Sequence, residues 1–150
     1  MTGVDFYILP ADDLTQLEHY ACRLVEKAFR QSIFCYLWCQ DQSQVERLDA
    51  LLWTFRAQSF VPHRIGSPDS ASDEVRQGWL AAAPPPPGWR DALVNLQATA
   101  PENALQFARI LELVDGNVDR RRQGRNRYKT YQQAGLTPVT HNLTSTNKHG

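Results

Sequence analysis

The residues best placed to do chemistry in this 150-residue sequence are cations that gather near its C-terminal end. Residues 120–131 read RRRQGRNRYKTY. If they form a helix, side chains three or four residues apart share one side of it, which brings together Arg121, Arg125, Tyr128 and Lys129. Cations beside an aromatic ring suit an anion that carries an apolar neighbour. The spacing therefore indicates a binding site for a short acidic peptide with an apolar end.

The charge distribution supports an anionic partner at this end of the chain. The formal net charge is zero, yet residues 1–119 contain 16 acidic and 9 basic groups, whereas residues 120–150 contain 7 basic and no acidic groups. An exposed ion pair contributes about 0.2 to 1 kcal/mol, and filling an apolar pocket contributes about 1.5 to 3 kcal/mol. A peptide that uses both would bind with roughly micromolar affinity and would weaken as salt is added. Two other interpretations stay open: a solvated basic face, and a footprint for the phosphate backbone of nucleic acid.

A second candidate surface is apolar and lies near the middle of the chain. Leu48, Leu52 and Phe55 have the spacing of a buried helical stripe. Trp53 is rotated by about 100° from Leu52, toward the edge of that stripe. An aromatic anchor with apolar neighbours and a polar rim is typical of a protein interface, and here it would comprise Trp53, Phe60, Val61, Pro62 and His63. The alternative, in which Trp53 and Phe60 complete the core, stays open on spacing alone.

Catalytic, cofactor and metal sites are not expected. The turn at residues 9–13 reads LPADD, which lacks the glycines that let a phosphate approach and carries carboxylates instead. Cys35 and Cys39 would lie about 13 Å apart along a strand, too far to bind one zinc ion together. Neither His19 nor His63 has a Ser or Cys nucleophile at a recognisable spacing. We therefore predict a protein that is not an enzyme.

The elements that must position these residues alternate between strands and helices in the first half of the chain. Residues 4–9 and 33–39 are short apolar runs, and the second is continuous enough for a strand covered on both faces. Residues 13–31 carry apolar side chains at helical spacing. A second helix follows, with Asp41 or Ser43 as its N-cap. This order predicts an α/β fold with a mostly parallel sheet flanked by helices.

The segments that follow the second helix are less regular. Residues 66–78 are polar and predict a surface loop. The segment AAAPPPPG at residues 81–88 suits neither a sheet interior nor a helix, so it serves as a spacer or as a binding segment. The basic helix is expected over residues 117–134. Gly124 lowers the propensity of this helix by about 1 kcal/mol relative to alanine and is expected to loosen the site.

Two more strands complete the expected domain. Residues 92–96 and 109–114 are assigned to strands, although the periodicity of residues 102–114 also fits a single helix. No internal repeat is visible, and the length suits one domain. We therefore expect a single α/β domain over residues 1–136 and a polar, frayed tail over residues 137–150.

The sequence also predicts a cellular compartment. No apolar run approaches the roughly 18 residues that a membrane helix requires. The N-terminus has no basic region ahead of an apolar stretch. Three cysteines, including Cys22, are an odd number and suit free thiols in a reducing environment. We expect a cytoplasmic protein without membrane contact.

Four segments together resemble one known family. They are VDFYIL at residues 4–9, LDALLW at 48–53, SFVPH at 59–63 and RNRYKTY at 125–131. In this order they are similar to the chi subunit of bacterial DNA polymerase III, and the likeness spans most of residues 4–136. The resemblance implies a Rossmann-like α/β adaptor without catalytic activity or cofactor.

The resemblance also implies two protein partners in DNA replication. One is the psi subunit of the clamp loader, held by the positions that match the family here, Trp53, Phe60, Val61, Pro62 and His63. The other is single-stranded DNA-binding protein, whose acidic tail ends in phenylalanine. The matching positions for that tail are Arg125, Tyr128 and Lys129, with Arg121 and Arg122 as neighbours. DNA itself would be contacted only indirectly, and the alternative is a module that binds nucleic acid directly through the basic helix.

Overall fold

The fold is an α/β domain built on one parallel sheet. The computed structural model describes residues 2–54, 62–66 and 77–143. Within them the strands are β1 (Gly3–Ile8), β2 (Cys35–Trp38), β3 (His63–Ile65), β4 (Gly78–Ala81), β5 (Ala92–Asn95), β6 (Arg109–Val114) and β7 (Val139–Asn142). They form a 7-stranded sheet in the order β3-β4-β2-β5-β6-β1-β7. Every pair of neighbouring strands is parallel, so the predicted fold class is confirmed.

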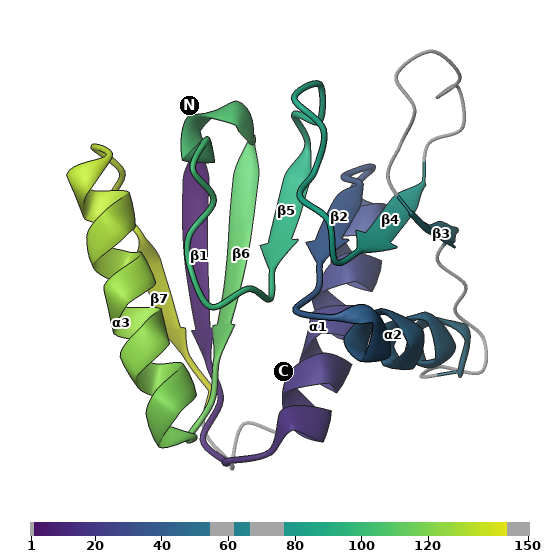
Figure 1. Ribbon diagram of the computed structural model, residues 1–150, viewed down its shortest axis with the longest axis horizontal. Coiled ribbons are helices and arrows are strands. Elements are labelled where there is room, and N and C mark those ends of the chain that lie inside the picture. Colours follow the sequence, from purple (N-terminus) through teal and green to yellow (C-terminus); the bar gives the residue numbers. More distant parts are fainter. Residues whose placement is uncertain (1, 55–61, 67–76, 144–150) are drawn as a thin grey trace.

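Helices cover both faces of the sheet. The helices α1 (Leu14–Arg30) and α2 (Gln42–Thr54) pack on one face, and α3 (Val118–Gln133) packs on the other, together with the short 3₁₀ helix η1 (Ala104–Gln106). The side chain of Asp13 caps α1 by accepting the N–H of Gln16 at 3.2 Å. Figure 1 shows α3 and β7 at one end of the sheet and α2, β3 and β4 at the other. The two predicted surfaces therefore lie far apart.

The central strands explain why the sequence reads as continuous apolar runs. In β2, Cys35 and Leu37 point to the α1 face and Tyr36 points to the α3 face, and all three are buried. In β1, Val4 and Phe6 belong to the α3 face. Successive side chains of a strand alternate between faces, so a strand that is covered on both sides needs apolar residues at every position.

Several sequence predictions are confirmed, and others are wrong. Strands occupy the expected regions 4–9, 33–39, 92–96 and 109–114, although β1 begins one residue earlier, at Gly3. The strand at 109–114 rules out a single helix over 102–114. The polar tail was expected to fray, but residues 139–142 form β7 against β1. The expected boundary after residue 136 therefore does not match the end of the sheet. A four-residue strand of sequence VTHN has no periodicity long enough to detect.

The strands β3 and β4 were also missed by sequence reasoning. Residues 78–81 form β4, which is buried along its length and pairs with both β2 and β3. The run is only four residues long and adjoins the prolines, so it carries little signal. The predicted loop at 66–78 falls mostly on residues 67–76, outside the described part of the chain.

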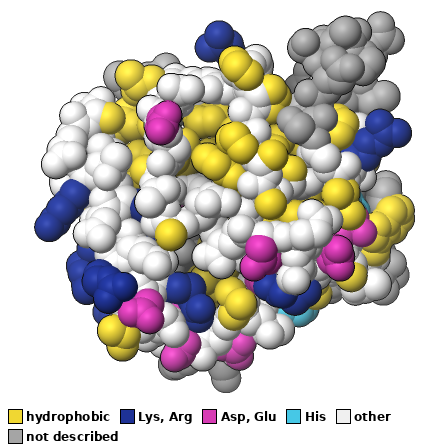
Figure 2. Space-filling view, in the orientation of Figure 1, with side chains coloured by type: hydrophobic (Ala, Val, Ile, Leu, Met, Phe, Trp, Pro, Cys, Tyr) yellow, Lys and Arg dark blue, Asp and Glu magenta, His cyan; other side chains and the backbone are white. Residues whose placement is uncertain are grey.

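The proline-rich segment covers the part of the sheet that α3 does not reach. The hydroxyl of Tyr36 donates to the carbonyl oxygen of Ala83 at 2.8 Å, and Nε1 of Trp38 donates to that of Ala82 at 3.1 Å. Gln106 donates to the carbonyl oxygen of Pro86 at 2.8 Å. Prolines have no backbone N–H to donate, so the carbonyl groups of this segment lack helical partners. Tyr36 and Trp38 of the sheet donate to these carbonyl groups instead. Figure 2 shows the broad apolar area on this side of the molecule.

Candidate functional site: a cationic groove beside α3

A buried ionic network fixes the orientation of α3 on the sheet. Nε of Arg127 donates to Oε1 of Glu112 at 2.7 Å, and the two side chains are 5% and 0% exposed. The hydroxyl of Tyr131 donates to the other oxygen of Glu112, and Asn95 donates to the same oxygen at 2.8 Å. Arg127 and Tyr131 thus hold one side of α3 against the sheet. The neighbouring side of the helix, which carries Arg121, Arg125 and Tyr128, therefore faces the end of the sheet.

Burial of the network changes the pKa values of Glu112 and Tyr131. Burial raises the pKa of Glu112, and the charge of Arg127 and the hydrogen bonds from Tyr131, Asn95 and Arg127 oppose that shift. Burial also raises the pKa of the Tyr131 hydroxyl, and the neighbouring Glu112 adds to the rise. Tyr131 therefore remains a hydrogen-bond donor throughout the physiological pH range. No sequence pattern pointed to this network.

Gly124 allows α3 to approach β6 closely. A Cβ atom at this position would lie 2.7 Å from Cγ2 of Val114. Sequence reasoning treated Gly124 as a residue that loosens the site and did not foresee this close approach of helix and strand. The helix backbone packs tightly against the strand at this point, since only glycine leaves room there.

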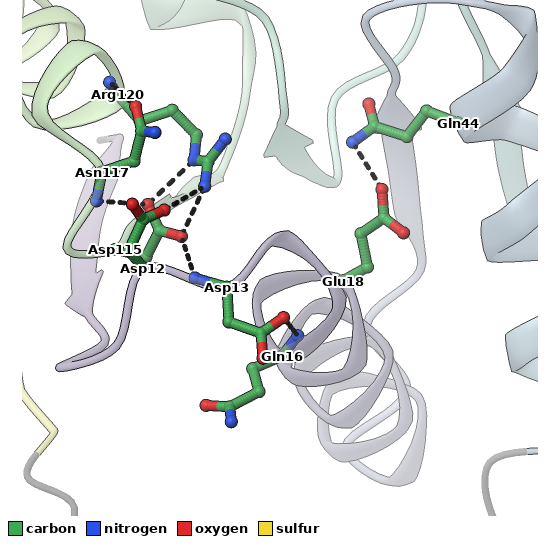
Figure 3. Close-up of polar contacts among 8 residues, drawn as sticks. All are labelled: Asp12, Asp13, Gln16, Glu18, Gln44, Asp115, Asn117 and Arg120. Atoms are coloured by element: carbon green, nitrogen blue, oxygen red, sulfur yellow. Dashed lines mark hydrogen bonds and ion pairs between the residues drawn. The ribbon is translucent and has the colours of Figure 1, made fainter.

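A second ion-pair cluster holds the N-terminal end of α3 and is drawn in Figure 3. Asn117 caps the helix by accepting the N–H of Arg120 at 3.0 Å. The guanidinium of Arg120 donates to both oxygens of the buried Asp115, at 2.8 and 2.7 Å, and lies 3.3 Å from Asp12. Asp115 also accepts the backbone N–H of Asp13 at 3.1 Å. Arg120, the first cation of the basic segment, is thus used inside the fold.

This cluster also affects the pKa of Asp115. Burial alone would raise the pKa, but the hydrogen bonds from Arg120, with those from the backbone of Asn117 and Asp13, outweigh it and hold the pKa below its usual range. The cluster occupies the carboxyl ends of β1 and β6. Open α/β sheets bind phosphates at such strand ends, and here protein side chains fill the position. This agrees with the acidic LPADD turn.

The groove itself runs between α3 and the end of the sheet and measures about 450 Å³. Its apolar lining comes from Phe6 and Ile8 of β1 and Val114 of β6. Its polar lining comes from α3 and β7: Arg121, Arg125, Tyr128, Lys129, Gln132, Thr140 and Asn142. The structure therefore brings together four of the five residues that were predicted to bind an acidic tail. Strand alternation in residues 4–9 could have indicated the apolar lining, because Phe6 and Ile8 share a face.

The cations of the groove are available to a ligand. Arg121, Arg125 and Lys129 are exposed, and no acidic side chain lines the groove. Among residues 2–54, 62–66 and 77–143, none of the three takes part in an ion pair. Figure 2 shows Lys and Arg side chains along the edge of the molecule that α3 occupies. The groove therefore combines an uncompensated positive rim with apolar surface.

Tyr128 connects the rim to the apolar lining. Its ring lies 5.2 Å from that of Phe6, measured between centroids, and is tilted by 50°. Its hydroxyl donates to the carbonyl oxygen of Pro138 at 3.3 Å, just before β7. The ring thus has a fixed position beside the cations, as the helical spacing predicted.

Arg122 does not belong to the groove. Its Nη1 lies 3.3 Å from Oδ1 of Asp119, and both side chains are more than half exposed. Neighbouring residues on a helix differ by about 100° in direction, so Arg122 points away from the side that Arg121 and Arg125 share. The structure does not place it with the other predicted residues.

The second predicted surface lies at the other end of the sheet. Trp53 is 56% exposed, so the alternative that it completes the core is wrong. The ring of His63 meets Trp53 edge-on at 5.3 Å, and its Nε2 lies 3.1 Å from Asp49. The side chain of His63 is only 1% exposed, so it packs against the ring of Trp53 and does not form part of an exposed rim. Pro62 is half-buried.

Phe60 and Val61, the remaining two predicted residues of this surface, lie outside the described part of the chain. Ile65 of β3 is 48% exposed and was not predicted. It shares with Trp53 the end of the molecule formed by α2 and β3. The described part of this surface therefore comprises Trp53, Pro62 and Ile65.

The described residues offer no metal or thiol chemistry. They contain no group of three His, Cys, Asp or Glu side chains that could hold a metal ion. Cys22, Cys35 and Cys39 are free and buried, and burial raises the pKa of each thiol to about 12. A thiol with so high a pKa is unreactive at neutral pH. None of the helices described is long and apolar enough to cross a membrane.

Comparison with known proteins gives a consistent result. The sequence profile of the family described as "DNA polymerase III chi subunit, HolC" matches residues 1–139. The chain is 37% identical over 143 residues to DNA polymerase III subunit chi of Pseudomonas aeruginosa, covering 95% of this chain and 98% of the relative. It is 28% identical to the subunit chi of Escherichia coli, covering 91% of this chain and 95% of the relative.

A solved structure supports the fold alone. The crystal structure of T4 UvsW superimposes with a TM-score of 0.64 at 8% identity, covering 95% of this chain. The chain spans 42% of the length of that protein. The parallel sheet and the family match over residues 1–139 lead to one conclusion. The chain belongs to the family of DNA polymerase III chi subunits.

Proposed function

We propose that this chain is a non-catalytic, cytoplasmic adaptor. It links the clamp loader to single-stranded DNA that is covered by single-stranded DNA-binding protein. The groove beside α3 captures the acidic, phenylalanine-ending tail of single-stranded DNA-binding protein. The surface around Trp53 binds the psi subunit. Because the two surfaces lie at opposite ends of the sheet (Figure 1), both partners can be bound at once.

The observation that carries the proposal is the composition of the groove. Arg121, Arg125 and Lys129 surround apolar surface without an acidic neighbour among the lining residues. Carboxylates of a tail would pair with the guanidinium groups, where charge-assisted hydrogen bonds are strongest. A terminal aromatic ring would pack on Phe6, Ile8 and Val114. A ligand with only one of these features would leave half of the groove unused.

The surface around Trp53 supports the second part of the proposal. Trp53 and Ile65, on the neighbouring elements α2 and β3, are both about half exposed, and apolar side chains that gather on one surface mark an interaction site. The buried contact of His63 with Asp49 holds the neighbouring β3 strand near α2. A pre-oriented tryptophan is the usual anchor of a protein interface.

The tail proposal is tested by calorimetric titration of a synthetic acidic peptide ending in phenylalanine. Arg125→Ala is expected to weaken binding by about tenfold or more, and the affinity should fall as salt is raised. Arg122→Ala is the matched control, because it removes the same charge from the same helix outside the groove. Equal losses in both variants would show that only net charge matters and would reject the groove.

The alternative of direct nucleic-acid binding is separated by a second titration. Bare single-stranded DNA is expected to bind weakly at physiological salt, since phosphate contacts do not use the apolar lining. If DNA bound tightly and competed with the peptide for Arg125, direct binding would be the better description.

The psi proposal is tested by co-purification of the two subunits and by titration. Trp53→Ala is expected to weaken the complex by about tenfold or more, as for an interface anchor. Leu105→Ala is the control, because Leu105 is 67% exposed but lies in η1, away from α2. An unchanged affinity for Trp53→Ala would reject this surface.

A further inference from the structure

The strand β7 forms one open edge of the sheet beside the groove. It pairs with β1 on one side only and ends the strand order. Nε2 of His141 lies 2.9 Å from Oδ1 of Asp5, and the His141 ring stacks on Tyr7 at 4.7 Å. These contacts lie on the face of the sheet opposite α3. They hold the short strand in place without using its outer backbone groups.

The hydrogen-bonding direction of each residue of β7 follows from its register. The N–H of Leu143 donates to the carbonyl oxygen of Ile8 at 2.8 Å, so Leu143 points its backbone groups at β1. Direction alternates along a strand, so His141 and Val139 do the same. Thr140 and Asn142 must therefore turn their N–H and C=O groups outward. Within the described part of the chain, no other backbone group takes up these outward donors.

Within residues 2–54, 62–66 and 77–143, the short length of β7, four residues, is the one feature of this edge that normally limits strand pairing. Edges are usually blunted by lysine, proline, a bulge or a covering segment. Residues 139–142 read VTHN, with no lysine, and the proline at position 138 only precedes the strand. Val139 is 52% exposed. Within the part of the chain that the structure describes, the edge is therefore open to a short extended segment of another chain.

The outward-facing residues of β7 are also residues of the groove. The side chains of Thr140 and Asn142 line it together with Arg121, Arg125 and Lys129. One pair of residues thus contributes side chains to the groove and backbone groups to the open edge. A peptide held by the groove passes directly beside unpaired donors and acceptors.

We propose that the acidic peptide bound by the groove adds to the sheet as an extended strand along β7. Backbone hydrogen bonds to Thr140 and Asn142 fix its register, as in other cases of strand addition to a sheet edge. In an extended peptide alternate side chains share a face, so every second residue points to the cations of α3. The inference rests on the proposed function of the groove and adds the conformation of its partner.

The pairing predicts which peptide residues matter. Side-chain recognition alone would require carboxylates near α3 and an apolar end, in any backbone conformation. Strand pairing also requires backbone N–H groups at every second position. An acidic peptide that keeps all its side chains, including the terminal phenylalanine, but lacks selected backbone N–H groups distinguishes the two.

The experiment is a calorimetric scan of synthetic acidic peptides that end in phenylalanine, each with one backbone nitrogen methylated. N-methylation removes a donor and leaves the side chains and their charges unchanged. We expect methylation at alternate positions to weaken binding by about tenfold, which corresponds to about 1.4 kcal/mol. Methylation at the positions between them should change the affinity by less than about twofold. The unmethylated peptide and the Arg122→Ala protein serve as controls.

Each outcome has a separate meaning. Equal binding by every methylated peptide, or an equal loss at every position, would overturn the strand pairing and leave the groove proposal intact. Failure of the unmethylated peptide to bind would overturn both proposals. Alternating losses would support the pairing.

Amide hydrogen exchange gives a second readout that needs no variant. Without peptide, the N–H of His141 is expected to exchange slowly because it bonds to β1, whereas those of Thr140 and Asn142 exchange quickly. With saturating peptide, exchange at Thr140 and Asn142 is expected to slow by about tenfold or more. Unchanged exchange at both residues while the peptide is bound would contradict the inference.

Discussion

Replacing Gly124 by alanine separates helix propensity from tertiary packing. Propensity alone predicts that Gly124→Ala stabilises α3 by about 1 kcal/mol. The structure predicts the opposite, because the new Cβ would lie 2.7 Å from Cγ2 of Val114. Valine is branched at Cβ and stiff about χ1, and Val114 is fixed in a buried strand. The methyl group cannot move aside, so the helix or the strand must shift.

The expected magnitude follows from two opposing contributions. Overpacking a well-packed core costs about 1 to 3 kcal/mol, and the propensity gain offsets about 1 kcal/mol. Gly124→Ala should therefore lower the free energy of unfolding by up to about 2 kcal/mol. Because both Gly124 and Val114 line the groove, the affinity for an acidic peptide should fall as well.

The assay is urea unfolding of four proteins: the parent, Gly124→Ala, Val114→Ala and the double variant. In the double variant the clash is gone, so the helix propensity gain should appear and the two substitutions should be non-additive by about 1 to 3 kcal/mol. Asn126→Ala, on the exposed side of α3, controls for propensity and should be neutral or slightly stabilising. If Gly124→Ala were as stable as Asn126→Ala, the argument that glycine is needed for close packing would be refuted.

Three further predictions concern the buried groups. Arg127→Ala leaves Glu112 buried without its cationic partner and should lower the free energy of unfolding by about 3 to 5 kcal/mol. Arg125→Ala, at an exposed site on the same helix, should change it by less than about 0.5 kcal/mol. Urea unfolding measures both values, and similar values would contradict the buried network. The pKa of Asp115 is lowered in the folded state, so its stabilising contribution is complete above the unfolded-state pKa and is lost as the pH falls through the folded-state pKa. Asp115→Asn should therefore destabilise by about 1.5 to 3 kcal/mol at pH 7, with a deficit that shrinks toward low pH, and a deficit independent of pH would disagree with the ion pair. Burial raises the pKa of Cys22, Cys35 and Cys39 to about 12, so a thiol reagent should label them at pH 8 only after unfolding; rapid labelling of the folded protein would show that the thiols are accessible.

The basic face of α3 was predictable because its information is local. The helical period alone places Arg121, Arg125, Tyr128 and Lys129 on one side, and these four residues line the groove. Strands and helices in the first half of the chain were predictable for the same reason, since each has a periodic or continuous apolar pattern. The exposure of Trp53 could only be stated as one of two alternatives, because residues at the edge of a helical stripe are buried or exposed according to their neighbours.

The tertiary structure decided the features that depend on residues distant in sequence. Helical spacing did not show that Arg122 pairs with Asp119 instead of facing the groove, nor that His63 is buried beneath Trp53. Gly124 reads as a weak point of a helix until Val114 is placed against it.

What the sequence by itself determined is the α/β class and the cationic side of one helix, because both arise from patterns within a single element. What only the tertiary structure decided is the groove as a binding site. Its apolar lining comes from β1 and β6, and its far side comes from β7, a four-residue strand that exists only because β1 offers it a pairing partner more than 130 residues away in sequence.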